Sequence, residues 1–256
     1  MTLKNTLATE FQDIASQWFT EKNPGLTPAD VVPGSGKPVW WKCPHGPDHE
    51  WRTRVVERTR NGRGCPYCAN QKASVTNNLR ALFPAVANQW HPTNNAGKRP
   101  EDFVAGSGKR AHWKCPAGPD HEWESTINNR TYGGCGCPFC SNKRVSVTNS
   151  LETGYPELAQ QWHPTKNERT PAQFVPGSHK IVWWKCDAGP DHEWSAEIKS
   201  RALYGSGCPC CSGLKASVTN SVSSLHPELA AQWHPRKNGD LTAADVVAGS
   251  GQKVWW

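Results

Sequence analysis

Residues 43–51 read Cys-Pro-His-Gly-Pro-Asp-His-Glu-Trp, and residues 65–68 read Cys-Pro-Tyr-Cys. These two segments hold four potential metal ligands, separated by five, fifteen and two residues: Cys43, His49, Cys65 and Cys68. The same residue types recur twice more with the same separations, as Cys115, His121, Cys137 and Cys140, and as Cys186, His192, Cys208 and Cys211. Three thiolates and one imidazole make a closed tetrahedral Zn²⁺ site, so the sequence predicts three structural zinc sites of the Cys3His type.

The tryptophans show that these motifs belong to a longer internal repeat. Four of them are spaced by 72, 72 and 71 residues: Trp18, Trp90, Trp162 and Trp233. A period of this length indicates small tandem domains, because the units of solenoids are shorter. We expect three zinc modules and then a truncated fourth repeat without ligands, at residues 1–74, 75–146, 147–217 and 218–256. They are called the first to fourth repeats below.

The fourth repeat ends where the other repeats continue into a ligand. Its last residues, Trp255-Trp256, correspond to Trp40-Trp41, after which the first repeat continues with Lys and Cys. Because this end falls inside a predicted strand, we expect the sequence to be a fragment that stops inside a fourth zinc module. The alternative is a cap that packs on the third repeat.

Composition favours small metal-stabilised modules in a reducing compartment. Only 36% of the 256 residues are apolar, and a repeat of this size is marginal as a core on its own, so a metal commonly supplies the missing stability. The motifs use nine of the eleven cysteines and leave Cys135 and Cys210. We see no secretory signal and no apolar run of membrane-spanning length. We therefore expect cysteines that bind metal rather than form disulfides, and a cytoplasmic location.

The net charge gives a mild basic bias. The formal value is +7 with cysteine counted as neutral. A Zn²⁺ ion with three thiolates and a neutral histidine carries −1, so three loaded sites reduce the total to about +4. A balance of this size is compatible with a nucleic-acid partner without establishing one.

Each repeat is predicted to open with an amphipathic helix. In the first repeat the apolar residues that share one helical face are Leu7, Phe11, Ile14, Ala15 and Trp18. Pro84, Pro156 and Pro227 fall inside the same span of the later repeats, and we expect them to restart the helix after a short turn. Thr148 or Asn149 is expected to cap the helix of the third repeat.

Two predicted strands enclose the first two ligands of each module. Residues 39–42 lead into Cys43, and the alternation of apolar and polar residues over 51–55 indicates a half-buried strand. Residues 27–30 have the pattern of a capped helical turn. Gly34–Lys37 is interpreted as a turn, because the phosphate-loop pattern is incomplete and a strand follows. The expected fold is a small α+β module of the zinc-ribbon or treble-clef type.

The combination Trp-Trp-Lys-Cys, His-Glu-Trp and Gly-Cys-Pro-x-Cys resembles a bacterial family of zinc-ribbon or treble-clef zinc finger domains of unknown function. The resemblance covers nearly the whole chain and implies zinc binding by the twelve ligands named above. Members occur in tandem arrays, sometimes beside endonuclease-like domains, which points towards nucleic-acid binding. Relatives often have a shorter first loop, so His45 or Asp48 competes with His49 as a ligand. His49 is favoured, because the later repeats have no counterpart of His45.

Two further sets of residues invite a catalytic or metal-binding interpretation that we do not favour. His91, His163 and His234 follow a repeated tryptophan, but the first repeat has Phe19 there and still has a full ligand set, so these histidines are predicted to be packed or capping residues. A glutamate follows each ligand histidine, at Glu50, Glu122 and Glu193. A site with four protein ligands has no open position for water, so we expect no enzyme activity.

Basic residues recur at three fixed places in each module and are candidate nucleic-acid contacts: Lys42, Arg58, Lys72, Lys114, Arg130, Arg144, Lys185, Arg201 and Lys215. Trp40, His112, Trp183 and Trp255 are predicted to point to the opposite side of the strand from Trp41, Trp113, Trp184 and Trp256. One of these two rows is expected to face the core, and the other can stack on unpaired bases. In the alternative interpretation both rows are buried, and the basic residues are either solvated or neutralise the charge of the thiolates.

The expected partner is therefore DNA or RNA. The alternatives are a scaffold that binds proteins and an accessory array of a nuclease or defence protein. No small-molecule substrate and no membrane partner is expected.

Overall fold

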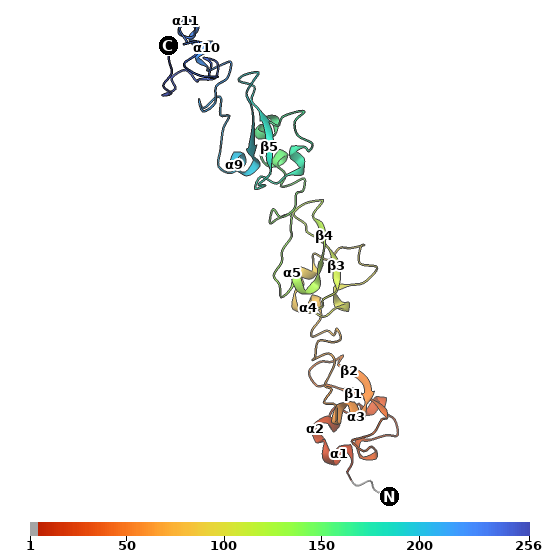
Figure 1. Cartoon of the computed structure of the whole chain (residues 1–256). Coiled ribbons are helices and arrows are strands. Elements are labelled where there is room, and N and C mark those ends of the chain that lie inside the picture. Colours follow the sequence, from red (N-terminus) through yellow and green to blue (C-terminus); the bar gives the residue numbers. More distant parts are fainter. Residues whose placement is uncertain (1–4) are drawn as a thin grey trace. The chain divides into compact units, whose positions relative to one another are not determined.

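The computed structural model describes residues 5–256 and repeats one series of short elements along the chain (Figure 1). The chain divides into two compact units, the residues up to Pro116 with Glu122–Gly136, and Ala117–His121 with Cys137–Trp256. None of the helices in residues 5–256 has the length and apolar character needed to span a membrane.

The first unit contains the helices and strands of the first and second repeats. Its α-helices are α1 (Leu7–Glu10), α2 (Gln12–Ala15), α3 (Val55–Thr59), α4 (Leu79–Leu82), α5 (Pro84–Ala87) and α6 (Ile127–Arg130). Its 3-10 helices are η1 (Thr20–Lys22), η2 (Pro28–Asp30) and η3 (Pro100–Asp102). Its strands are β1 (Pro38–Lys42), β2 (Glu50–Arg54), β3 (Arg110–Lys114) and β4 (Glu122–Thr126).

The second unit repeats the same order. It contains α7 (Leu151–Gly154), α8 (Pro156–Gln160), η4 (Pro171–Gln173), β5 (Ile181–Lys185), β6 (Glu193–Glu197), α9 (Ile198–Ala202), α10 (Val222–Leu225) and α11 (Pro227–Ala230). Each module is therefore small α+β, as expected.

The predicted amphipathic helix is two single turns rather than one helix. Between α1 and α2 the backbone of Phe11 leaves the helical region, at φ −138° and ψ 63°. Pro84, Pro156 and Pro227 begin α5, α8 and α11, which confirms the predicted restart. The first repeat has Gln12 at this position and breaks in the same way, so proline is not the cause of the break.

The helix of the third repeat is capped by a residue other than the two we expected. Ser150 is the N-cap of α7, and its hydroxyl accepts a hydrogen bond from the Thr153 backbone N–H at 3.1 Å. Thr148 and Asn149 have their hydrogen bonds elsewhere, beside the metal ligands, as described below.

A two-stranded antiparallel hairpin carries the core of each module. The hairpins are β1–β2, β3–β4 and β5–β6. Trp41, Trp113 and Trp184 are fully buried, so theirs is the row that faces the core. In the first repeat the Trp41 ring packs edge-on against Trp18, with centroids 5.7 Å apart, and its Nε1–H donates to the Thr53 carbonyl at 3.2 Å. The indole N–H therefore has a partner inside the core.

Both predicted turns before the first hairpin are present. The Asp30 carboxylate accepts from the Thr27 backbone N–H at 2.8 Å and from its hydroxyl at 2.5 Å, which closes the capped turn η2. Gly34–Lys37 leads directly into β1, as expected for a turn rather than a phosphate loop.

The fourth repeat packs its helical part in the same way as the other three. Val222, Ala243 and Val246 form a small buried cluster. The Trp233 ring lies edge-on to Trp256, with centroids 5.3 Å apart, as its counterparts do in the complete repeats.

Candidate metal centres

The structure brings the twelve predicted ligands together in three groups of four. In every group the potential ligand atoms all lie within 4.8 Å of one another. Zn–S and Zn–N bonds of ~2.3 and ~2.0 Å give tetrahedral edges of about 3.8 Å between sulfurs and about 3.5 Å between sulfur and nitrogen. In the first group Cys43 Sγ lies 3.6 Å from Cys68 Sγ, and Cys65 Sγ lies 3.7 Å from His49 Nδ1. These atoms are therefore spaced for one Zn²⁺ ion.

Local structure explains how four distant residues meet. Cys43 follows the last residue of β1, and His49 precedes the first residue of β2, so the hairpin holds these two ligands together. The Cys43 backbone N–H donates to the His49 carbonyl at 3.0 Å, which closes the loop between them. Cys65 and Cys68 lie on the knuckle that follows α3.

Hydrogen bonds determine which nitrogen of each ligand histidine faces the metal. His49 Nε2 lies 3.1 Å from Ser74 Oγ and 2.8 Å from Thr76 Oγ1, whereas Nδ1 faces the thiols. The other ligand histidines repeat this geometry, with Ser146 and Thr148 at His121 and with Ser217 and Thr219 at His192. Nδ1 is therefore the ligand atom and Nε2–H is the donor, the arrangement that orients a metal-bound imidazole.

This outer layer of the site was not predicted from the sequence. It comes from a Ser-Val-Thr-Asn segment at 74–77, 146–149 and 217–220. Its constant position, starting six residues after the last cysteine of each group, was the available signal. Asn77 Nδ2 donates to the Tyr67 carbonyl of the knuckle at 2.7 Å, and Asp48 Oδ2 accepts from the Val75 N–H at 2.9 Å. One segment thus fixes the knuckle, the ligand loop and the imidazole.

Removing one of these hydroxyls is expected to weaken zinc binding without abolishing it. Thr148→Val should lower the affinity of the second site for zinc by about 10- to 100-fold, because His121 loses a hydrogen bond that orients it. Competition with a chromophoric chelator measures the change. Thr165→Val is the matched control, since Thr165 is exposed and distant in sequence from the ligands. Equal affinities for the two variants would show that the hydroxyl does not support the ligand.

His45 contacts the first site without belonging to its group of four. Its Nδ1 lies 3.2 Å from Cys43 Sγ, while His49 completes the ligand group, as expected. Burial raises the pKa of the Cys43 thiol, but hydrogen bonds from the backbone and side chain of His45 and from His49 outweigh it and lower the pKa to about 6. Asp48, the other alternative to His49 as a ligand, instead accepts a hydrogen bond from the Val75 backbone N–H.

The two remaining cysteines lie outside the three groups. Cys135 is exposed. Cys210 is buried on the third knuckle, in the sequence position where the other repeats have an aromatic residue stacked on the ligand imidazole. These stacked pairs have ring centroids 5.1 Å apart for His49–Tyr67 and 5.0 Å apart for His121–Phe139.

Three of the four arginines predicted to contact nucleic acid are buried, so this part of the predicted surface is wrong. Arg58, Arg130 and Arg201 are only 4–5% exposed. Each guanidinium lies over two tryptophan rings of its hairpin, 4.6–5.2 Å from their centroids: Trp41 and Trp51, Trp113 and Trp123, Trp184 and Trp194. Each also donates to the side chain of a glutamine that precedes the repeated tryptophan: Gln17, Gln89 and Gln161.

The buried arginines lie close enough to the metal ligands to interact with their charge. Burial lowers the pKa of Arg58, while the thiolates of Cys65 and Cys43 oppose this shift. Arg201 has the same relation to Cys208 and Cys186. Because a loaded Cys3His site carries −1, the guanidinium compensates that charge from inside the module.

The predicted lysine contacts remain at the surface, most of them beside a glutamate. Lys42, Lys114 and Lys185 pair with the glutamate that follows the ligand histidine, over 3.6, 2.7 and 3.8 Å. Lys215 donates to the Glu193 carbonyl at 3.2 Å. Lys72 and Arg144 are exposed.

The repeated histidines outside the metal groups cap turns, as predicted. His91 Nδ1 accepts from the Asn94 backbone N–H at 3.2 Å, and its Nε2 lies 3.2 Å from Glu122 Oε2. His163 and His234 accept backbone N–H groups in the same way. These histidines are absent from the three metal groups.

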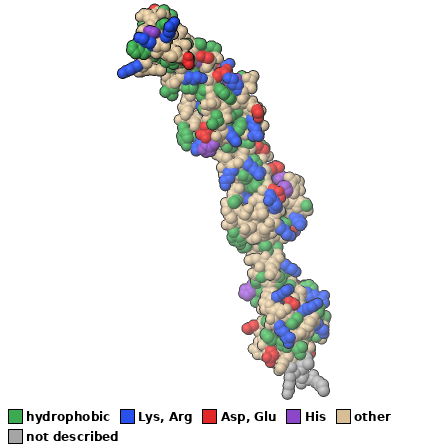
Figure 2. Space-filling model, in the orientation of Figure 1, with side chains coloured by type: hydrophobic (Ala, Val, Ile, Leu, Met, Phe, Trp, Pro, Cys, Tyr) green, Lys and Arg blue, Asp and Glu red, His purple; other side chains and the backbone are tan. Residues whose placement is uncertain are grey.

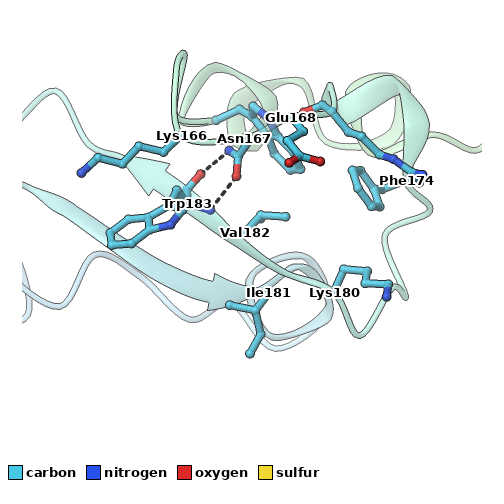
Figure 3. A pocket seen from close by; sticks show the side chains of 10 residues that line it. Lys166, Asn167, Glu168, Phe174, Lys180, Ile181, Val182 and Trp183 are labelled. Atoms are coloured by element: carbon cyan, nitrogen blue, oxygen red, sulfur yellow. Dashed lines mark hydrogen bonds between the residues drawn. The ribbon is translucent and has the colours of Figure 1, made fainter.

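The outward aromatic row is held in place by asparagines. Figure 3 shows Asn167 joined to both backbone groups of Trp183, at 2.9 Å from its N–H and 2.8 Å from its carbonyl. Lys166 lies over the Trp183 ring, 4.5 Å from its centroid. The hollow of 460 Å³ beside this ring is lined by Ile181, Phe174 and other residues. Asn23, Asn95 and Asn238 bond Trp40, His112 and Trp255 in the same way.

Comparison with known families agrees with this geometry. The model of a family described as a probable treble clef zinc finger domain matches the chain four times, at residues 14–71, 86–143, 158–214 and 229–256. The first three matches each contain a complete ligand group and end before the Ser-Val-Thr-Asn segment. No curated protein matches the chain.

Proposed function

The chain belongs to the treble clef zinc finger family, and on this premise we propose that its repeats bind nucleic acid through outward aromatic side chains and exposed cations. We propose a structural role for the zinc ions, because four protein ligands occupy each site and leave no position for a reacting water.

One repeated feature carries the proposal: a lysine lies over the outward tryptophan in three of the four repeats. The distances from the ammonium to the ring centroid are 4.8 Å for Lys22–Trp40, 4.5 Å for Lys166–Trp183 and 4.6 Å for Lys237–Trp255. A fixed aromatic face beside a cation is the combination that binds single-stranded nucleic acid, since the ring stacks on a base and the charge attracts phosphate.

The distribution of charge along the chain supports the same function. The first two repeats contain 19 basic and 12 acidic residues, whereas the rest of the chain contains 10 of each. The whole basic excess therefore lies in residues 1–146. Figure 2 shows several Lys and Arg side chains on the visible face of the first repeat.

Loss of two outward rings is expected to weaken binding of a single strand. Trp40→Ala with Trp183→Ala should reduce affinity for a single-stranded oligonucleotide about 30-fold or more, because base–aromatic stacking is worth ~1–3 kcal/mol per base. Fluorescence anisotropy with labelled single- and double-stranded DNA and RNA measures it. Tyr204→Ala removes an exposed ring outside this row and is the control. Absence of binding by the unaltered chain at low salt would refute the proposed function.

The third repeat favours a second candidate, a protein-binding scaffold, for part of the chain. It exposes large apolar side chains, with Ile181 72%, Tyr204 70% and Leu214 83% exposed, and it has no basic excess. Exposed apolar groups of this kind mark interaction surfaces. A partner bound there would be retained at high salt, whereas binding to nucleic acid weakens steeply with salt.

A further inference from the structure

We infer that the first repeat has its own site for a phosphodiester backbone, in the cleft between strand β2 and the zinc knuckle. This inference rests on the proposed nucleic-acid function and assigns its principal electrostatic contact to one repeat. The residues that define this basic cleft are Arg52, Arg63 and Lys72.

The cleft is lined by both buried and exposed residues. Its volume is 550 Å³, and its lining includes Trp51, which is buried, and Pro66 of the knuckle. Arg52 extends from β2, Arg63 precedes the knuckle and Lys72 follows it, so the hairpin and the metal-bound segment hold the three cations around one space. Loading of the zinc site therefore positions two sides of the cleft.

The cations of the basic cleft form few ion pairs within the described part of the chain. All three side chains are exposed, and within residues 5–256 no ion pair is formed by Arg52 or Lys72. Arg63 pairs through Nε with Glu57 at 3.0 Å. Two guanidinium groups and one ammonium around a single cleft suit the oxygen atoms of phosphates, which arginine binds in a bidentate manner.

The cleft adjoins the outward aromatic row. Arg52 is the cross-strand partner of Trp40 in the β1–β2 hairpin, so both project from the same face. A base stacked on Trp40 would place its backbone beside Arg52. An acidic protein segment would gain the charge contacts but not the stacking, and for this reason we assign the cleft to nucleic acid.

The second and third repeats form the same hairpin and knuckle but lack the two arginines of the basic cleft. The positions of Arg52 and Arg63 are occupied by Glu124 and Cys135 in the second repeat and by Ser195 and Ser206 in the third. Glu124 also binds the Arg110 guanidinium, at 2.7 Å. Because serine stands at both positions of a folded third repeat, the change to serine is compatible with the hairpin and the knuckle.

The test replaces both arginines by the residues of the third repeat in the full zinc-loaded chain. Arg52→Ser with Arg63→Ser should lower affinity for a 20-nucleotide single strand by about tenfold or more at 100 mM salt. It should also reduce the slope of log K against log[salt] by about 1.4 for the single strand and about 1.8 for the matched duplex. Arg236→Ser with Lys253→Ser removes two exposed cations from the fourth repeat and should change neither quantity to this extent.

Three outcomes are distinguishable. If the unaltered chain binds and only the cleft variant loses affinity and slope, the inference stands. If the unaltered chain binds and both variants match it, the cleft inference fails while the proposed function survives. If the unaltered chain binds neither probe but binds poly-glutamate in a way that depends on Arg52 and Arg63, the cleft belongs to an acidic protein and both proposals fail.

Discussion

A chain stripped of zinc is expected to lose its folded modules. Each module would lose an apparent binding energy on the order of 10 kcal/mol, which exceeds the net stability that a core of this size retains. The strand pairs contain five residues per strand, and the α-helices contain four or five residues, too few to persist alone. Elemental analysis should give three zinc ions per chain before chelation. Far-ultraviolet circular dichroism and tryptophan fluorescence should then change together with metal loss.

Substitution of a single metal ligand is expected to have the same effect at one site. Cys137→Ser should reduce the zinc content from three ions to two and unfold the second module, because Cys137 is a buried member of the ligand group. Cys135→Ser is a closely matched control: it lies two residues away on the same segment, is exposed and belongs to no group. Unchanged spectra after verified metal removal, or equal zinc contents for the two variants, would contradict a metal-dependent fold.

The metal centres were predictable from sequence because their chemistry is local and repeated. Ligand identity and spacing recur three times, and only a shared geometric requirement keeps all three gaps constant. Alternation along the strand predicted that Trp40 and Trp41 face opposite sides, but it left open which of the two is buried. The break in the helix at Phe11 was harder to predict from the sequence, since Gln12 carries no sequence signal for a helix start.

The arginines could not be placed from sequence alone. An arginine at a constant position in three repeats has the same pattern whether it contacts a phosphate or a buried thiolate. The difference lies in the tertiary contacts of Arg58, which bring two tryptophan rings and Gln17 around it. Thr76 was missed for a related reason, because its partner His49 lies 27 residues away in the sequence.

The buried arginine leads to the second large expected effect, on stability. Arg58→Met keeps the length and apolar stem of the side chain but removes its charge. The variant leaves the Gln17 amide oxygen without its 2.8 Å donor and removes a cation that lies over the Trp41 and Trp51 rings. It also leaves the thiolate charge of the metal site uncompensated. We expect a loss of about 2–4 kcal/mol in the free energy of unfolding, together with weaker zinc binding at the first site.

Urea unfolding of the zinc-saturated protein measures this loss, and Arg60→Met is the control on the same segment, since Arg60 is exposed. A solvated arginine that served only to attract phosphate would behave in the opposite way: its loss would spare stability and weaken nucleic-acid binding. Measurements of stability and of nucleic-acid binding therefore distinguish an arginine that stabilises the module from one that attracts phosphate. Arg58→Met should change stability and metal affinity, whereas Arg52→Ser should change the salt dependence of binding and leave stability near that of the unaltered chain, because one side chain faces the thiolates and the other faces solvent.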